Sequence, residues 1–117
     1  MSKRDWKLFL MDILECIKKI EKYTTGLSYD EFLNDSKTLD AVIRNLEIIG
    51  EAANKVPKYV QQKYKEIPWA QIVSLRNRLV HAYFVIDYEI VWHIVTTELF
   101  NLKNKIELIL KKETKDD

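Results

Sequence analysis

Four residues in the stretch RNRLVHAYF, at positions 76–84, have types and spacing that could carry out acid–base chemistry. Arg76 and Asn77 are adjacent, His81 follows the arginine by five positions, and Tyr83 follows the histidine by two. A histidine side chain titrates near neutral pH, so it can take up or release a proton under physiological conditions. A guanidinium is permanently charged and can stabilise negative charge that develops on a reacting oxygen.

The element that must carry these residues is a helix over WAQIVSLRNRLVH, residues 69–81. At 100° per residue, four apolar residues of this helix lie within about 60° on either side of Arg76, namely Ile72, Val73, Leu79 and Val80. Arg76 therefore occupies the middle of an apolar stripe, whereas Arg78 points to the other side. A charge in that position is costly unless it is paired.

Two interpretations of the stripe remain open. In the first, Arg76 pairs with Glu47 or Glu51, and His81 is a hydrogen-bonded histidine at a helix end. In the second, these residues line a cleft between helices. The segment AYFVI lacks a polar helical pattern and Asp87 is a good residue to start another helix. His81 and Tyr83 are then expected at a helix-to-helix turn beside Arg76.

The rest of the chain predicts an all-α, up-and-down bundle of four long helices with one or two short ones. The first long helix should end near Gly26, and Ser28 with Glu31 has capping-box spacing for a short turn. Asp35 or Ser36 should start a second long helix that ends near Val56. The third long helix is 69–81, and the fourth should start at Asp87 and carry an apolar stripe to residue 109.

The second long helix has two informative faces. Gly50 lies on its apolar face, and because glycine costs about 1 kcal/mol relative to alanine inside a helix, we expect a neighbouring helix to approach closely there. The opposite face is polar and carries Arg44, Glu47, Glu51 and Asn54, a spacing that favours a solvated, salt-bridged surface. The lysines at 55, 58, 63 and 65 could approach a nucleic acid, but Glu66 and the balanced total charge favour a solvated surface for these lysines too. Trp69 is expected in the core.

Length and composition limit the possible functions. The chain has 117 residues and a net charge of +1, so we expect one domain over 1–117, with a frayed tail at 110–117, and no binding of nucleic acid through total charge alone. Acidic residues and lysines interrupt the apolar N-terminal segment, which argues against a signal peptide or a membrane span and favours a cytoplasmic protein. Cys16, His81 and His93 have no metal-binding spacing, so no metal site and no cofactor are expected.

The motif and its surroundings resemble a known family. The chain contains an R-x4-H-x-Y motif formed by Arg76, His81 and Tyr83. This motif is similar to that of the HepT-like toxins, which are minimal members of the HEPN superfamily of ribonucleases. The segments AVIRNLEIIGEAANKVP and IPWAQIVSLRNRLVHAYFVIDYEIVWHIV are also similar to family sequences, so the resemblance covers most of residues 36–102. It implies a HEPN-like bundle.

The resemblance also implies an activity and site residues. It implies a metal-independent endoribonuclease toxin in which His81 moves protons, Arg76 holds the phosphoryl oxygens, and Asn77 orients the imidazole or binds phosphate. Because one histidine does not easily serve as both acid and base, a homodimer with facing motifs is expected. An MntA-like nucleotidyltransferase antitoxin would attach AMP to Tyr83, which places negative charge where RNA phosphates must bind.

Other interpretations remain beside the enzyme. Tyr83 could simply pack the helix turn with its hydroxyl in water. The whole chain could be a binding module whose cleft holds a nucleotide or the nucleotidyltransferase without cutting RNA. A purely structural bundle ranks last, because it leaves the position of Arg76 unexplained.

Overall fold

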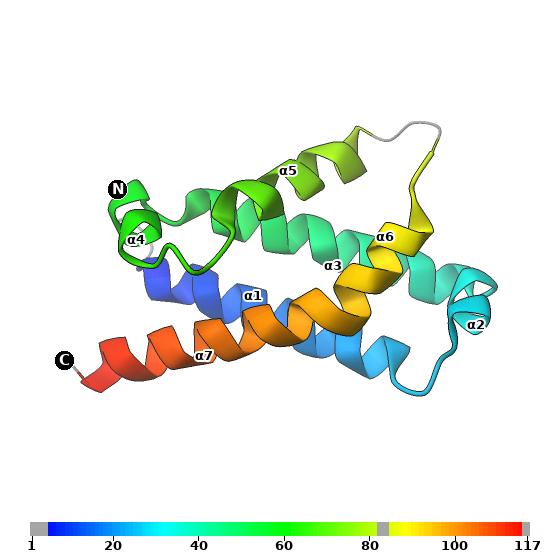
Figure 1. Ribbon diagram of the computed structural model, residues 1–117, viewed down its shortest axis with the longest axis horizontal. Coiled ribbons are helices and arrows are strands. Elements are labelled where there is room, and N and C mark those ends of the chain that lie inside the picture. Colours follow the sequence, from blue (N-terminus) through cyan, green and yellow to red (C-terminus); the bar gives the residue numbers. More distant parts are fainter. Residues whose placement is uncertain (1–4, 82–84, 116–117) are drawn as a thin grey trace.

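All regular elements in the part of the chain that the computed structural model describes, residues 5–81 and 85–115, are helical (Figure 1). The predicted all-α bundle with long and short helices is therefore confirmed. The elements in chain order are α1 (Trp6–Thr24), α2 (Tyr29–Leu33), α3 (Ser36–Lys55), α4 (Lys58–Lys63), α5 (Trp69–Val80), α6 (Tyr88–His93), the π-helical turn η1 (Ile94–Glu98) and α7 (Leu99–Lys115).

The helix ends follow the capping signals of the sequence. Gly26 adopts a φ of 82°, a left-handed conformation that glycine takes without steric cost, and so ends α1. Ser28 and Glu31 form the complete capping box predicted for α2. The carboxylate of Asp35 accepts a hydrogen bond from the Thr38 amide at the start of α3, and Asp87 caps α6 in the same way.

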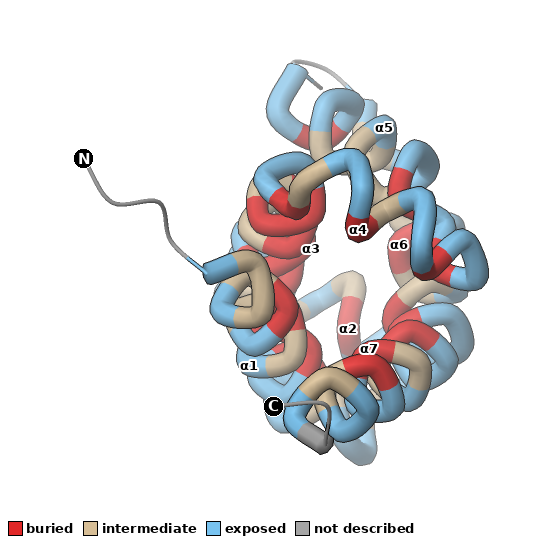
Figure 2. The backbone as a smooth tube through the Cα atoms, turned by 90° about the vertical axis from the view of Figure 1, so that its left-hand side faces the viewer, coloured by how far each residue is buried: buried red, intermediate tan, exposed pale blue. Residues whose placement is uncertain are grey.

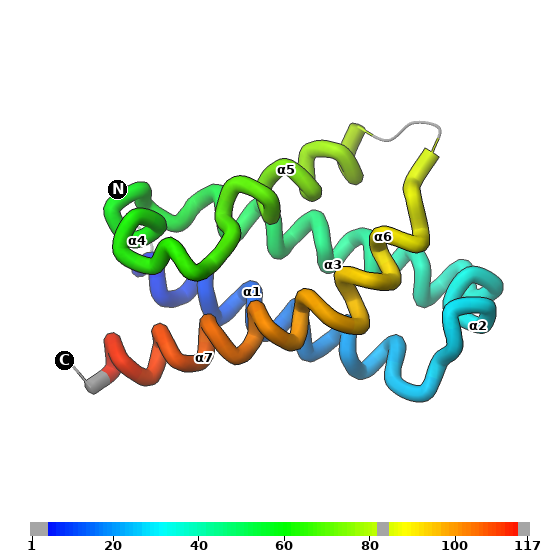
Figure 3. The backbone as a smooth tube through the Cα atoms, viewed as in Figure 1, coloured from blue at the N-terminus to red at the C-terminus, as the bar shows by residue number. Residues whose placement is uncertain are grey.

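Consecutive long helices run in opposite directions, as the colour order along the chain shows (Figures 1 and 3). α3 packs against α1 on one side and α5 on the other, and α7 packs along α1. Seen along the bundle, the buried positions of the long helices face its interior (Figure 2). The largest fully buried side chains come from several elements: Phe32, Leu10, Ile13, Ile17, Ile20, Ile67, Ile106, Val42, Val60 and Val91.

The fourth long helix differs from the prediction because its hydrogen-bonding pattern changes within it. The π-helical turn η1 lies between α6 and α7, and it brings His93 and Glu98, five residues apart, within 3.8 Å of each other. Both side chains are more than half exposed. A π turn inserts one residue into the helical repeat, so it shifts the buried face between the two halves.

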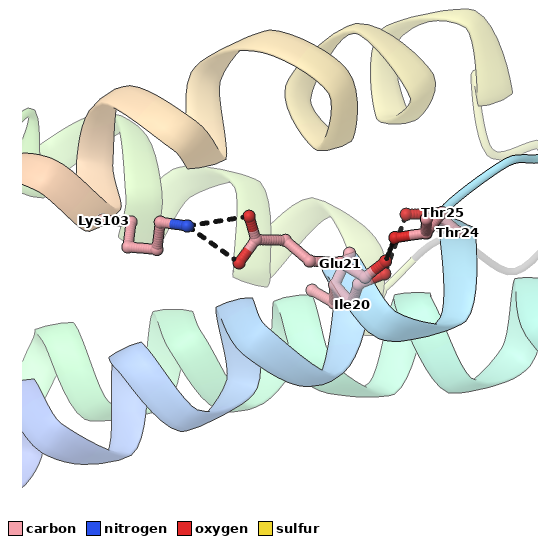
Figure 4. A network of polar contacts seen from close by, with 5 residues as sticks. All are labelled: Ile20, Glu21, Thr24, Thr25 and Lys103. Atoms are coloured by element: carbon pink, nitrogen blue, oxygen red, sulfur yellow. Dashed lines mark hydrogen bonds and ion pairs between the residues drawn. The ribbon is translucent and has the colours of Figure 1, made fainter.

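Among the polar contacts that hold α7 to the bundle, two lie near its ends. Lys103 Nζ lies 2.9 and 3.2 Å from the two carboxylate oxygens of Glu21 near the end of α1 (Figure 4). At the other end of α7, Glu113 accepts hydrogen bonds from the Tyr64 hydroxyl and, at 3.1 Å, from Lys63 Nζ. Glu113 lies within the predicted frayed tail, residues 110–117, and makes these contacts with the bundle. Fraying of this tail stays a prediction.

The apolar residues of the long helices form the core of the bundle. Cys16 is 6% exposed within the core, as its position in an apolar stripe predicts. Within the described ranges, none of the helices has the length and hydropathy needed to cross a bilayer.

Candidate functional site

The site begins where α3 and α5 meet, because Gly50 allows the two helices to approach closely. A Cβ atom built on Gly50 would lie 2.7 Å from Arg76 Cγ and 3.2 Å from the carbonyl oxygen of Ile72, and still closer to Arg76 Cβ. These separations are shorter than ordinary van der Waals contact of about 3.5–4.0 Å. The close approach predicted at Gly50 is therefore confirmed, and its partner is the stem of Arg76.

The guanidinium of Arg76 extends from this contact to the edge of the bundle. Its Nη1 donates a hydrogen bond of 3.0 Å to Asn77 Oδ1, and its Nη2 lies 3.7 Å from Glu51 Oε1. Its Nε is buried and has no hydrogen-bond acceptor among the described groups. The side chain is 32% exposed, so Arg76 is half-buried at a rim and is not sealed in the core.

Glu51 belongs to a row of alternating charges on α3 and α5. Glu47 lies 3.5 Å from Arg44, Arg44 lies 3.9 Å from Glu51, and Glu51 lies 3.7 Å from Arg76. Partly exposed pairs at such distances typically contribute about 0–1 kcal/mol. The salt-bridged face predicted for α3 is thus present, and Glu51 orients Arg76 only weakly, so an anion can compete for the guanidinium.

A cavity of about 300 Å³ adjoins the guanidinium. It lies between the C-terminal part of α3 and the middle of α5. Its lining consists of Glu51, Asn54, Lys55, Val73, Arg76 and Asn77. Two of the four predicted site residues, Arg76 and Asn77, therefore meet at one cavity, with cationic and amide groups around them.

The other two predicted residues lie elsewhere. His81 is exposed and ends α5, where its backbone amide donates to the Asn77 carbonyl oxygen at 3.1 Å. Its imidazole does not line the cavity at Arg76. The position at a helix end is the predicted one. Tyr83 lies outside the described residues.

A larger cavity lies away from the motif. It measures about 610 Å³ and lies on the other side of α5, against α6, η1 and the start of α7. Its lining is mainly apolar, with Arg78 and His93 among its polar groups, and none of the described motif residues contributes to it. The chemistry of the lining, rather than the volume, therefore identifies the smaller cavity as the candidate site.

The described part of the chain shows no group of three or more His, Cys, Asp or Glu side chains arranged to hold a metal ion. The charged groups at the Arg76 cavity are Arg76, Lys55 and Glu51. This lining suits an anionic ligand held by nitrogen donors.

Sequence reasoning identified Arg76 and Asn77 but not the full lining. It left Glu47 and Glu51 as equal candidates to pair with Arg76, and only the position at which α5 crosses α3 selects Glu51. Asn54 and Lys55 were interpreted as surface residues. The signal that could have found them is the helical spacing itself, because Asn54 and Lys55 follow Glu51 by three and four residues, which is one helical turn.

Comparisons with known proteins support the family resemblance. The family described as Ribonuclease HepT-like matches residues 13–109 of this chain. A protein of Methanocaldococcus jannaschii named "Putative RNase MJ0127" is 47% identical over 111 residues, which cover 95% of this chain and 92% of that protein. A protein of Thermococcus cleftensis named "Probable ribonuclease HepT" is 42% identical over 109 residues, which cover 93% and 99%. No solved structure matches.

Proposed function

Because the chain belongs to the HepT-like ribonuclease family, we propose that it is a metal-independent endoribonuclease that uses the 2′-hydroxyl of RNA as its nucleophile. In such a reaction the 2′-oxygen bonds to the adjacent phosphorus and the bond from phosphorus to the 5′-oxygen breaks. One group must take the proton of the 2′-hydroxyl, and another must give a proton to the leaving oxygen. The products are a 2′,3′-cyclic phosphate and a 5′-hydroxyl.

Arg76 is the group that we assign to the phosphoryl oxygens. The single observation that carries the proposal is the half-buried guanidinium, anchored at Gly50, with a lysine in the same cavity and a buried Nε that has no acceptor among the described residues. An unsatisfied buried donor costs about 1–3 kcal/mol. A phosphate oxygen that reached this donor would remove the cost and would gain most from it as charge accumulates in the transition state.

His81 is the group that we assign to proton transfer, and Asn77 supports the site. His81 is exposed at the end of α5, so RNA can reach its imidazole. It lies five residues beyond Arg76 and does not share the cavity. Asn77 holds Arg76 Nη1 through its side-chain oxygen, which fixes the guanidinium plane. Its amide nitrogen keeps its hydrogen-bonding capacity for phosphate.

A homodimer would complete the acid–base pair. One protomer contributes one His81, whereas the reaction needs a base and an acid, so two motifs that face each other across a shared cleft would supply both. The mass in solution tests this part of the proposal. A dimer at micromolar concentration supports it, and a folded, active monomer contradicts it.

The proposed biological role is that of the toxin in a toxin–antitoxin pair. An MntA-like nucleotidyltransferase would be the antitoxin and would attach AMP to Tyr83, two residues from His81. The added nucleotide would put negative charge where RNA phosphates must bind and would lower RNA affinity. Mass spectrometry after incubation with such an enzyme and ATP tests the idea, which fails if Tyr83 is unmodified.

One observation favours a second candidate, a binding module that does not cut RNA. In this structure Arg76 contacts Glu51 and Asn77, and His81 is absent from the lining of the Arg76 cavity. A site of this form could hold a nucleotide or the nucleotidyltransferase through charge alone. This candidate predicts binding that depends on Arg76 and does not depend on His81.

RNA cleavage in EDTA separates the two candidates. The wild type, His81→Ala and Arg76→Ala are compared after circular dichroism has shown that all three fold. Loss of a general acid–base group typically costs about 10²–10⁴-fold in rate, and loss of one preorganised donor about 10²–10³-fold. Cleavage by the wild type that falls to this extent in both variants supports the enzyme. Intact RNA with the wild type, or equal cleavage by the variants, favours the binding module.

A further inference from the structure

Three adjoining cavities lead away from Arg76 along α4. The first is the 300 Å³ cavity at Arg76; the second, of about 580 Å³, shares Asn54, Lys55, Val73 and Asn77 with it. The third, of about 450 Å³, shares Lys58, Gln61, Trp69 and Ala70 with the second. Because each cavity shares lining residues with the next, the three lie side by side along one surface, which we name the α4 groove.

The α4 groove is positively charged although the whole chain is nearly neutral. Lys55, Lys58 and Lys65 line it and are exposed. Within the described residues, none of the three forms an ion pair, whereas their neighbour Lys63 lies 3.1 Å from a carboxylate oxygen of Glu113. The acidic residue in the lining is Glu51, and it lies within 4 Å of both Arg76 and Arg44.

Side-chain amides alternate with the lysines in the lining. Asn54 and Asn77 lie near Arg76, and Gln61 and Gln62 lie on α4. Gln61 is held in place because its Nε2 donates to the carbonyl oxygens of Val56 at 3.0 Å and Ala53 at 3.3 Å. Its Oε1 then remains available, among the described residues, to accept a hydrogen bond from a ligand. Amides can bind phosphate oxygens and ribose hydroxyls, which are the groups that a protein contacts on a nucleic-acid backbone.

Base stacking has no platform in this groove. Trp69 lines it, but this residue is only 6% exposed and its indole N–H donates to the Tyr64 carbonyl oxygen at 3.0 Å. Affinity must then come from contacts with phosphate and sugar, which carry no base preference. The individual volumes, 300–580 Å³, suit one nucleotide each.

We propose that the α4 groove binds the backbone of single-stranded RNA on one side of the bond cleaved at Arg76, with Lys55, Lys58 and Lys65 on successive phosphates. The inference rests on the proposed function, because it takes Arg76 as the phosphate-binding end of the groove. It revises the interpretation of these lysines as an ordinary solvated surface. The groove selects RNA by its backbone and is indifferent to base sequence.

The test compares two triple variants that lose the same charge. Lys55→Ala/Lys58→Ala/Lys65→Ala removes the groove lysines, and Lys18→Ala/Lys22→Ala/Lys37→Ala removes three exposed lysines from α1 and the start of α3. The ligand is a fluorescent 12-nucleotide 2′-O-methyl RNA, which lacks the attacking hydroxyl and stays intact. Affinity is measured over a range of salt concentrations by anisotropy.

The expected result is a change in salt dependence that is specific to the groove. Each lost phosphate contact lowers the slope of log affinity against log salt by about 0.7 for a single strand, so the groove variant should lose about 2 in slope. The control variant should keep the wild-type slope. A groove variant that matches the wild type, or a control variant that loses as much, overturns the proposal.

Cleavage of a dinucleotide by a double variant, Lys58→Ala/Lys65→Ala, separates this inference from the proposed function. Neither lysine lines the cavity at Arg76, so this variant should cut a dinucleotide at the wild-type rate and cut the 12-nucleotide RNA more slowly. If dinucleotide cleavage is normal and the groove variant binds the 12-nucleotide RNA as the wild type does, the groove proposal fails and the proposed ribonuclease activity stands. If the groove variant keeps RNA affinity but loses a nucleotidyltransferase partner, the groove is a protein-docking surface and the proposal fails.

Discussion

Gly50→Ala is the substitution whose effect on the site follows most directly from the structure. The new Cβ would lie 2.7 Å from Arg76 Cγ and closer to Arg76 Cβ. Ordinary contact needs about 3.5–4.0 Å, so α5 must move away from α3 by on the order of 1 Å. The clashing atoms belong to the stem of Arg76 and to the backbone of α5, so rotation of a side-chain end cannot relieve the clash.

Stability and activity should respond to this movement by different amounts. Overpacking typically costs about 1–3 kcal/mol, and the higher helix propensity of alanine returns about 1 kcal/mol, so the variant should still fold. A displacement of about 1 Å at a reacting centre can cost about 10²-fold in rate. We therefore expect a loss of up to about 2 kcal/mol in unfolding free energy and a fall of about 10²-fold in single-turnover RNA cleavage.

Gly26→Ala supplies the matched control. Gly26 has a φ of 82° and no atom within 4 Å of a built Cβ, so alanine there is strained without a clash. Left-handed backbone costs a non-glycine residue roughly 1–2 kcal/mol, which is similar to the loss expected at Gly50. Denaturant unfolding gives both stabilities. Wild-type cleavage by folded Gly50→Ala, or an equal loss of cleavage in Gly26→Ala, would refute the positioning role of Gly50.

Three further predictions concern stability and reactivity. The backbone amide of Ser28 donates a hydrogen bond to the Glu31 carboxylate and holds the pKa of Glu31 below its ordinary value of 4.5. The charged carboxylate therefore stabilises the fold above pH 4.5, and this stabilisation is lost as the pH falls below 4.5 and the carboxylate is protonated. Glu31→Gln should keep the cap without the charge, and its unfolding free energy should fall less than that of the wild type between about pH 5 and about pH 3. Burial raises the pKa of the Cys16 thiol above 9.0, so a thiol reagent should label Cys16 only when the protein unfolds, and rapid labelling of the native protein would contradict its buried position. The Lys103–Glu21 pair is partly exposed, so Lys103→Met should cost less than about 1 kcal/mol and leave RNA cleavage unchanged.

The helix boundaries could be predicted because their causes are local. A capping box at Ser28 and Glu31, an N-cap at Asp35 and a left-handed glycine at Gly26 each depend on residues within one turn. Apolar stripes then indicate which face is buried. The π turn Ile94–Glu98 has no such local signal, because no side-chain cap marks its start.

The site was less predictable because it depends on how two helices cross. The sequence places Gly50 and Arg76 each on an apolar face, but only the packing of α5 on α3 brings them into contact. That crossing also selects Glu51 over Glu47 as the partner of Arg76. Total charge is likewise a poor guide to the α4 groove, because ion pairs neutralise Lys63 and not Lys55, Lys58 or Lys65 among the described residues.

The identity of the RNA ends after cleavage tests the central claim most directly. Attack by the 2′-hydroxyl, with His81 moving protons and Arg76 holding the phosphate, leaves a 2′,3′-cyclic phosphate on one fragment and a 5′-hydroxyl on the other. Mass spectrometry of the fragments made by the wild type in EDTA distinguishes these ends from others. Cyclic phosphate ends that disappear with Arg76→Ala would support the account. Fragments that carry a 5′-phosphate, or cyclic ends that persist in that variant, would contradict it.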